Sequence, residues 1–176
     1  MNLSMLDREQ LEDILLNPPR VEVHPLQTRI RHVLAAAHEL LVRSANTALV
    51  GRCVLDSPTL VKNYFKVHFA GAERETFVVV FLDSQMRVIA TEELFAGTLQ
   101  QTSVYPREVV KRALHHNAGG VIFGHPHPSG QCEPSRADEF LTQTLKSALS
   151  LIDVRVLDHM VVSGSTCTSF AERGLL

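Results

Sequence analysis

Apolar residues in the first fifty positions recur at the spacing of α-helices. Within residues 6–16, and again within residues 29–43, they gather on one helical face. The segment Asn17-Pro18-Pro19 separates the two stretches and is typical of a helix stop. The pattern therefore predicts two helices, at 6–16 and 29–43.

Beyond Gly51 the apolar residues are denser and more often β-branched. Residues 76–82 (TFVVVFL) are almost continuously apolar, which predicts a strand buried on both faces. Asp83-Ser84 offers a turn into a second strand at 86–91. We therefore expect a β-hairpin at this point in the chain.

Helices and strands are interspersed in the remaining sequence. Pro106 can begin a helix that ends near Asn117, residues 121–124 read as a short buried strand, and the apolar spacing of 135–149 predicts another helix. Strands at 154–157 and 160–163 follow, before a turn that leads to 166–170. This order predicts an α/β (α+β) fold, with a mixed β-sheet flanked by helices and a short helical N-terminal extension.

Composition and charge make some functions less probable without choosing one. The 176 residues are 45% hydrophobic and 20% charged, with a formal net charge of -2, which is ordinary for a soluble globular protein. Basic stripes of the kind that bind nucleic acid are weak. The three cysteines are widely spaced, so no disulfide framework or thiolate zinc site is indicated, and a reducing cytoplasm is expected. We find no basic-then-apolar leader and no apolar run of about 20 residues, so no membrane association is expected.

The segment from His125 to Asp138 carries the clearest chemical signal. Two histidines one residue apart in extended chain point to the same face. Pro126 and Pro128 each push the preceding histidine out of the α region, so His125 and His127 can converge on one point. Asp138, one turn into the next helix, can supply a third ligand, and three ligands with an open fourth position are typical of a catalytic zinc.

The same residues also have plainer interpretations. A His-x-His pair often occurs without a metal, and His115-His116 is interpreted as helix surface. Ser135 and Asp138 have the spacing of a capping box, with Ser135 at the N-cap and Asp138 at the third helical position. The capping and metal interpretations are compatible, and both stay open.

The run H-P-H-P-x6-S-x2-D resembles the JAMM motif of the JAB/MPN metalloproteases, and more narrowly the chain is similar to bacterial RadC proteins. The resemblance extends from about residue 53 to the C-terminus, through Glu92-Glu93-Leu94-Phe95 with Gly97-Thr98, Tyr105-Pro106-Arg107-Glu108, Leu157-Asp158-His159 and Ser169-Phe170. It departs at Pro126, where that family usually has Asn. It implies residues 53–176 as a catalytic JAB/MPN domain and residues 1–52 as a helical extension.

The resemblance also implies roles for single residues. His125, His127 and Asp138 would hold Zn²⁺, and Ser135 would donate a hydrogen bond to the developing oxyanion. The family's water-activating glutamate falls on Glu75, with Glu92 and Glu93 as rivals. The implied activity is that of a zinc-dependent metallopeptidase or isopeptidase acting on a peptide or isopeptide substrate.

Two further residues lie in the resembling segment Leu157-Asp158-His159. We interpret His159 as a core histidine in preference to a neighbour of the metal ligands. Asp158 is a candidate for orienting a metal-bound histidine, because such histidines generally donate their other ring N–H to a carboxylate or carbonyl.

Two other functions remain as alternatives. Two histidines and a carboxylate also describe the facial triad of non-haem iron oxygenases, although these usually have jelly-roll folds. A non-catalytic DNA-repair or DNA-maintenance module of the RadC type is the second. Residues 1–50 contain no glycine for the helix-hairpin-helix module of longer RadC chains, and Arg29, Arg31 and Arg43 form only a weak basic footprint. Strong duplex-DNA binding is therefore not expected.

Overall fold

The computed structural model describes residues 3–16, 25–56, 58–96 and 104–176. The chain forms two compact units, Met1–Ala48 and Leu49–Leu176. The helix stop at Asn17-Pro18-Pro19 and the family residues Gly97-Thr98 lie outside the described residues. The domain division at 52/53 stays a prediction.

The first unit contains the two predicted helices. A short 3-10 turn, η1 (Leu3–Met5), precedes α1 (Arg8–Leu16), and α2 (Pro25–Leu49) is longer at both ends than the predicted helix. Asp7 starts α1, because its Oδ1 accepts from the Gln10 backbone N–H at 2.8 Å and Gln10 Oε1 accepts from the Asp7 N–H at 2.9 Å. The buried contacts between the helices come from Leu11, Ile14 and Ala36, with Leu3, Leu6 and Leu40 packed around them.

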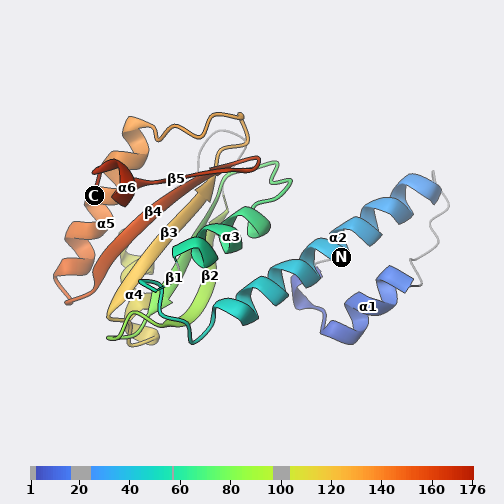
Figure 1. The fold of residues 1–176 in the computed structure, drawn as a ribbon, viewed down its shortest axis with the longest axis horizontal. Helices are drawn as coiled ribbons and strands as arrows, with labels where there is room; N and C mark the ends of the chain where they lie inside the picture. Colours follow the sequence, from blue (N-terminus) through green and yellow to red (C-terminus); the bar gives the residue numbers. More distant parts are fainter. Residues whose placement is uncertain (1–2, 17–24, 57, 97–103) are drawn as a thin grey trace. The chain divides into compact units, whose positions relative to one another are not determined.

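The second unit is built on a five-stranded sheet of order β2-β1-β3-β4-β5 (Figure 1). Only the β3·β4 pair is parallel, and the other three pairs are antiparallel. The sheet is therefore mixed, as predicted. The strands are β1 (Thr76–Leu82), β2 (Val88–Ala96), β3 (Gly120–Pro126), β4 (Arg155–Ser163) and β5 (Thr166–Ser169).

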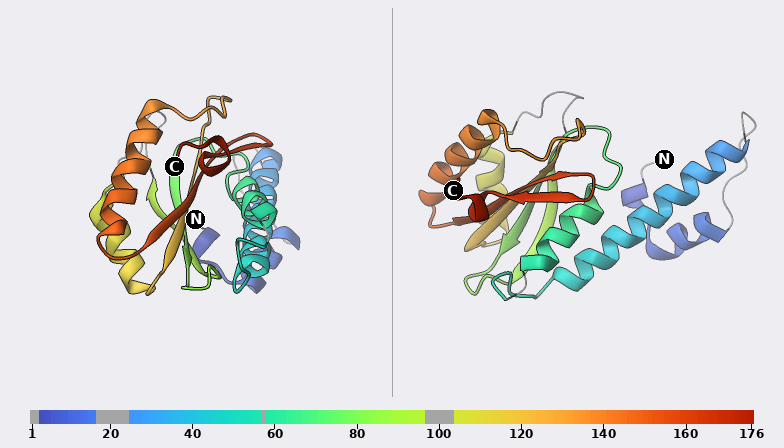
Figure 2. Two further views of the ribbon diagram at one scale, coloured as in Figure 1. Left: turned by 60° about the vertical axis from the view of Figure 1, so that its left-hand side comes forward. Right: turned by 45° about the horizontal axis from the view of Figure 1, so that its top comes forward.

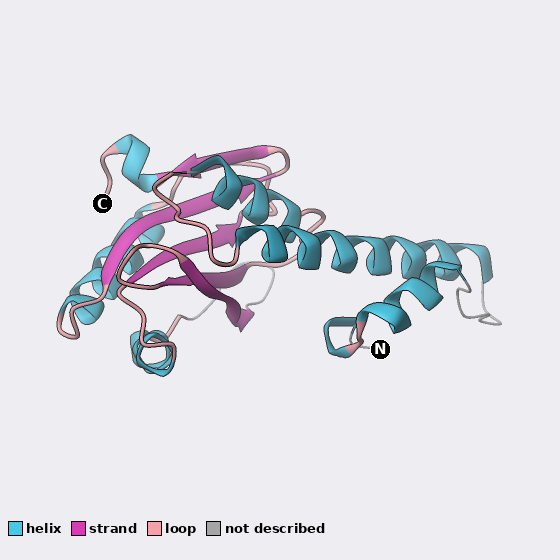
Figure 3. Ribbon diagram, turned by 60° about the horizontal axis from the view of Figure 1, so that its bottom comes forward, coloured by secondary structure: helices cyan, strands magenta, loops and turns pink. Residues whose placement is uncertain are grey.

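Helices cover both faces of this sheet. α3 (Pro58–His68) lies on one face, and α4 (Pro106–His115) and α5 (Arg136–Ser150) lie on the other (Figures 2 and 3). Because alternate residues of a strand point to opposite faces, β1 and β3 each contribute side chains to the packing on both faces of the sheet. The main core lies on the α4/α5 face and includes Phe77, Val79, Phe81, Val109, Ala113, Val121, Phe123, Leu145 and Leu149. Burial of β1 on both faces confirms the prediction made from its apolar run.

The opposite face depends on one glycine. A Cβ built on Gly124 of β3 would lie 2.3 Å from Phe65 Cε1, and Phe65 is fully buried. The missing side chain lets the Phe65 ring of α3 approach the β3 backbone directly. Gly124 immediately precedes His125, so this contact holds the β3 backbone in place where the segment from His125 to Asp138 begins.

Several predicted bounds are wrong. The strand predicted at 86–91 begins and ends later, as β2. It begins later because Asp83 Oδ1 accepts from the N–H groups of Gln85 and Arg87 and Met86 has a φ of 59°. These interactions extend the turn. The two strands predicted at 154–157 and 160–163 are one continuous strand, β4.

The helix α3 is not among the predicted elements. Its sequence signals were present, since Pro58 stands in the first turn and the buried residues Val61, Tyr64 and Phe65 have helical spacing. A further short helix, α6 (Phe170–Arg173), follows β5. None of the helices described has the length and apolar character needed to cross a bilayer.

Candidate metal centre

The two histidines of the motif lie at the carboxyl end of β3. His125 belongs to the strand, and His127 follows directly, held by its backbone N–H donating to Val162 O at 2.8 Å and by Ser163 Oγ donating to His127 O at 3.0 Å. Since the chain is extended here, both imidazoles point to the α4/α5 face. The carboxyl end of a strand that leads into a helix is a common position for a binding site in α/β folds.

The third member of the motif comes from the first turn of α5. Ser135 is the N-cap, and its Oγ accepts from the Asp138 N–H at 3.2 Å while Asp138 Oδ2 accepts from the Ser135 N–H at 2.7 Å. This is the predicted capping box. It fixes the backbone and the side chain of Asp138 together, and so directs the carboxylate at the two histidines.

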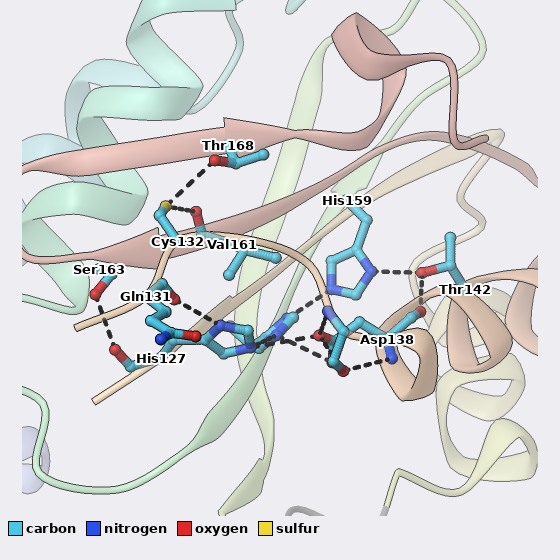
Figure 4. Close-up of polar contacts among 11 residues, drawn as sticks. His127, Gln131, Cys132, Asp138, Thr142, His159, Val161, Ser163 and Thr168 are labelled. Atoms are coloured by element: carbon cyan, nitrogen blue, oxygen red, sulfur yellow. Dashed lines mark hydrogen bonds and ion pairs between the residues drawn. The ribbon is translucent and has the colours of Figure 1, made fainter. Parts of the chain in front are cut away.

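The metal-binding groups of the three residues face one another. His125 Nε2 and His127 Nε2 lie 3.0 Å apart, His125 Nε2 lies 3.3 Å from Asp138 Oδ1, and His127 Nε2 lies 3.4 Å from Asp138 Oδ2 (Figure 4). Tetrahedral zinc with bonds of about 2.0–2.1 Å separates its ligand atoms by about 3.3–3.4 Å. The two Asp138 distances match this spacing, although they involve different carboxylate oxygens, and the distance between the histidine nitrogens is about 0.3 Å shorter. The three side chains thus converge as a metal site requires. Within the described ranges, these residues form the only group of three that could hold a metal.

A main-chain carbonyl fixes the proton of His127. Its Nδ1 lies 2.9 Å from Gln131 O, and a carbonyl oxygen only accepts, so Nδ1 carries a proton. Nε2 is then the nitrogen available to a metal ion. The hydrogen bond with Asp138 raises the pKa of His127, burial opposes the rise, and the negative charges of Asp138 and Glu75 add to it.

The carboxylate of Asp138 is held in its charged form. Burial alone would raise the pKa of Asp138, but its interactions with His125, His127 and Ser135 outweigh burial and hold it well below its usual range. The side chains of His125, His127 and Asp138 are only 7%, 12% and 15% exposed. A partly buried anion facing two imidazole nitrogens is a suitable donor set for a divalent cation.

Glu75 lies beside this group. It precedes β1 by one residue and is partly buried. β1 and β3 pair antiparallel as far as Val78 opposite Gly124, and an unbroken continuation of this register by three residues would bring Glu75 level with His127. The effect of its charge on the pKa of His127 also indicates proximity.

The rival glutamates have other partners. Glu92 binds Arg112 through both carboxylate oxygens and also lies 2.8 Å from His116 Nε2. The hydrogen bond from Arg112 is the main cause that lowers the pKa of Glu92. Glu93 lies 3.6 Å from His68 Nε2 of α3. The structure therefore does not bring Glu92 or Glu93 together with the two histidines.

The hydroxyl of Ser135 is engaged with the ligand carboxylate. Ser135 Oγ donates to Asp138 Oδ2 at 2.7 Å and accepts from the Asp138 N–H. In this structure Ser135 therefore acts as the predicted helix cap. Donation to an oxyanion requires the hydroxyl proton to turn away from Asp138, and it stays a proposal.

The interpretation of His159 and Asp158 needs correction. His159 is fully buried, as a core histidine would be, but its Nε2 also lies 2.8 Å from His125 Nδ1. Burial lowers the pKa of His159 well below its usual value, so the ring is neutral. Asp158, one candidate for orienting a metal-bound histidine, has other partners, because its carboxylate accepts from Ser169 Oγ at 2.6 Å and from the N–H groups of His159 and Ala171.

Two other contributors were not predicted from the sequence. Gln131 acts through its backbone carbonyl, so its residue type carries no signal. Thr142 lies 2.6 Å from His159 Nδ1 (Figure 4). The only available signal for Thr142 is its position one helical turn after Asp138, on a face that is otherwise apolar.

Comparisons with known proteins show the family to which the chain is similar. A sequence model of the family described as "RadC-like JAB domain" matches residues 55–175. A UPF0758 protein of Variovorax paradoxus (strain S110) is 59% identical over 146 residues, which are 83% of this chain and 65% of that protein. A UPF0758 protein of Acidovorax sp. (strain JS42) is 58% identical over 146 residues, or 83% of this chain and 61% of that protein. The chain thus spans less than two thirds of the length of these relatives, and their names state no activity.

Proposed function

Because this chain belongs to the RadC-like JAB domain family, we propose that it is a zinc-dependent hydrolase of the metallopeptidase or isopeptidase type. The observation that carries the proposal is the meeting of His125 Nε2, His127 Nε2 and the Asp138 carboxylate at 3.0–3.4 Å. These three residues would hold Zn²⁺, which when bound lowers the pKa of a coordinated water and polarises a substrate carbonyl.

Glu75 is the proposed general base. The proposal is supported by the effect of its negative charge on the pKa of His127 and by its position one residue before β1, which pairs with β3. A base in this position accepts the proton of the attacking water and then donates it to the nitrogen of the leaving amine. One proton thus passes from water to leaving group, and the carboxylate is regenerated in each cycle.

Ser135 is the proposed oxyanion donor. Its hydroxyl is within 2.7 Å of a ligand oxygen, and rotation about its Cβ–Oγ bond is all that is needed to redirect the proton. A donor held by a helix N-terminus is already oriented, which lowers the cost of stabilising developing negative charge. The capping interaction with the Asp138 N–H can persist during this rotation, because there the Ser135 oxygen is the acceptor.

A cleft beside His127 offers a place for the substrate. It has a volume of about 300 Å³ and is bordered by His127, the α3–β1 loop and the β4–β5 turn. Phe69, Ala72 and Val162 give it apolar walls, and glycines contribute much of the rest. Walls with little side-chain bulk would suit an extended peptide segment, and of the candidate site residues His127 borders this cleft.

The two alternatives make different demands. The five-stranded mixed sheet between helices is unlike the jelly roll of most facial-triad oxygenases, and this favours the hydrolase. An accessory DNA-maintenance module needs no turnover, so the hydrolase must be tested by activity.

The test combines metal analysis with an unbiased screen of peptide and isopeptide substrates. Zinc-loaded protein should cleave members of the library. Glu75→Gln should retain zinc yet lose about 10²-fold or more in rate, while Glu92→Gln and Glu93→Gln, the matched controls, should stay close to the parent. Full activity in Glu75→Gln with loss in one of the controls would reassign the base. No cleavage by zinc-loaded parent protein would favour the accessory-module alternative.

A further inference from the structure

A continuous line of buried side chains connects two of the three ligand residues. Thr142 Oγ1 donates to the Asp138 carbonyl O at 2.6 Å and also lies 2.6 Å from His159 Nδ1. His159 Nε2 in turn lies 2.8 Å from His125 Nδ1. Thr142 and His159 are fully buried, and His125 is 6% exposed. The line therefore begins at the backbone of Asp138 and ends at the imidazole whose other nitrogen faces the Asp138 carboxylate.

The chemistry of these groups allows one direction for each hydrogen bond. A hydroxyl has a single proton, and a carbonyl oxygen only accepts, so the Thr142 proton goes to Asp138 O. At its contact with His159 Nδ1, the Thr142 oxygen must then accept, and Nδ1 carries the proton. His159 is fully buried among aromatic rings, where a charged imidazole would lose its hydration, so the ring is neutral and has one such proton. His159 Nε2 is therefore an acceptor.

The same reasoning determines which ring nitrogen of His125 carries the proton. His159 Nε2 accepts, so the proton between the two rings belongs to His125 Nδ1. The remaining nitrogen of a neutral His125, Nε2, therefore presents its lone pair. This is the atom that lies 3.0 Å from His127 Nε2 and 3.3 Å from Asp138 Oδ1.

We propose that Thr142 and His159 are positioning residues that hold His125 in the tautomer whose Nε2 lone pair faces His127 and Asp138. Neither residue is a ligand, and neither touches the substrate. Both act through the orientation and tautomer of His125. The proposal rests on the metal centre of the proposed function, but not on the reaction or its substrate.

Packing alone does not explain a histidine at position 159. Its ring stacks on Phe170 at a centroid distance of 4.8 Å and meets the edges of Phe77 and Phe123 at 5.6 and 5.7 Å. An apolar side chain would fill this space without the cost of burying two polar nitrogens. The partners on both nitrogens are the feature that distinguishes His159 from its aromatic surroundings.

Helix α5 offers a matched control. Thr142 and Thr144 each donate a hydroxyl proton to the carbonyl four residues earlier, at 2.6 Å and 2.9 Å. Among the contacts described, only Thr142 also meets His159. Replacing either by valine removes the same local hydrogen bond, but only Thr142→Val removes the acceptor for His159 Nδ1.

The experiment measures zinc affinity by competition with a chromophoric chelator, and it records the imidazole tautomers of the metal-free protein by long-range proton–nitrogen NMR. Thr142→Val should weaken zinc binding by about 10-fold or more, the usual effect of removing an outer partner of a metal-bound histidine. Thr142→Ser, which keeps the hydroxyl, should restore affinity to near that of the parent, and Thr144→Val should leave it unchanged. The parent spectra should show His125 protonated at Nδ1.

A second pair of variants tests His159 itself. His159→Gln has an amide oxygen that can accept from His125 Nδ1 and should retain more affinity than His159→Met, which has no comparable acceptor. Equal zinc affinity in Thr142→Val and the parent, equal weakening in Thr144→Val, or His125 protonated at Nε2 would each overturn the proposal. If the parent itself takes up no zinc, the metal centre of the proposed function fails. That result differs from a parent that binds zinc with an affinity independent of Thr142 and His159, which would refute the positioning role alone.

Discussion

A substitution of Asp158 tests whether this residue stabilises the fold or supports zinc binding. Its carboxylate accepts three hydrogen bonds, from Ser169 Oγ at 2.6 Å, His159 N–H at 2.7 Å and Ala171 N–H at 3.0 Å, and the residue is 9% exposed. These contacts join β4 to the start of α6. Asp158→Ala should therefore destabilise the C-terminal part of the domain and leave the metal ligands in place.

The expected size follows from those contacts. At a net value of about 1 kcal/mol per hydrogen bond, three bonds contribute about 3 kcal/mol. Burial raises the pKa of Asp158, so the carboxylate also carries a desolvation cost that its removal relieves. We expect a net loss of about 2–3 kcal/mol, which for a chain of this size lowers the melting temperature by about 5–10 °C.

Thermal and urea denaturation of the variant measure the loss, and a zinc titration well below its melting temperature measures the metal site. Ser169→Ala, which removes one donor and the N-cap of α6, should lie between parent and Asp158→Ala in stability. A variant with parental stability but zinc binding weakened 10-fold or more would refute the reasoning and return Asp158 to the role of histidine orienter.

Further predictions concern the packing, a thiol and a partner. Gly124→Ala should destabilise the second unit by about 1–3 kcal/mol in urea denaturation, because its Cβ would meet the buried Phe65 ring; an unchanged midpoint would contradict this. Burial, and then the neighbouring Cys132, raises the pKa of the Cys167 thiol from 9.0 to about 11. Its thiolate fraction at pH 8 is therefore about 100-fold below that of an ordinary thiol, so its alkylation should be slow in the folded protein, fast in denaturant, and should rise with pH until about pH 11; equal rates in both states would contradict this. With a net charge of -2, the isolated chain should bind duplex DNA no better than micromolar near physiological salt; nanomolar binding with a steep salt dependence in fluorescence anisotropy would contradict this.

The parts of the fold that were predictable are those with a strong local signal. β1 is an uninterrupted apolar run, and α5 has both a capping box and an apolar face. β4 was divided wrongly because Asp158-His159 interrupts its apolar run, and polar residues normally mark a strand end. Here both side chains have buried partners on other elements, Ser169 on β5 and Thr142 on α5, which no local pattern displays.

In the candidate site, too, some residues could be predicted from local sequence and others depend on long-range contacts. His125, His127 and Asp138 are close in sequence, so proline and capping rules together with the resemblance to the JAMM motif allow their convergence to be predicted. Choosing Glu75 over its rivals needs the β1·β3 register and the ion pair of Glu92 with Arg112, which are long-range facts. The hydrogen bonds that connect Thr142, His159 and His125 depend on the packing of α5 against β4, so the sequence alone does not reveal them.

The most direct test of the metal centre is an X-ray absorption spectrum of the zinc-loaded protein at the zinc edge. The structure predicts a first shell of nitrogen and oxygen at about 2.0–2.1 Å, with the multiple scattering of two imidazoles. In His127→Ala either the zinc should be lost or one imidazole should disappear from the spectrum. A sulfur scatterer at about 2.3 Å, which would point to Cys132 in the neighbouring loop, or a spectrum and zinc content unchanged in His127→Ala, would contradict the account.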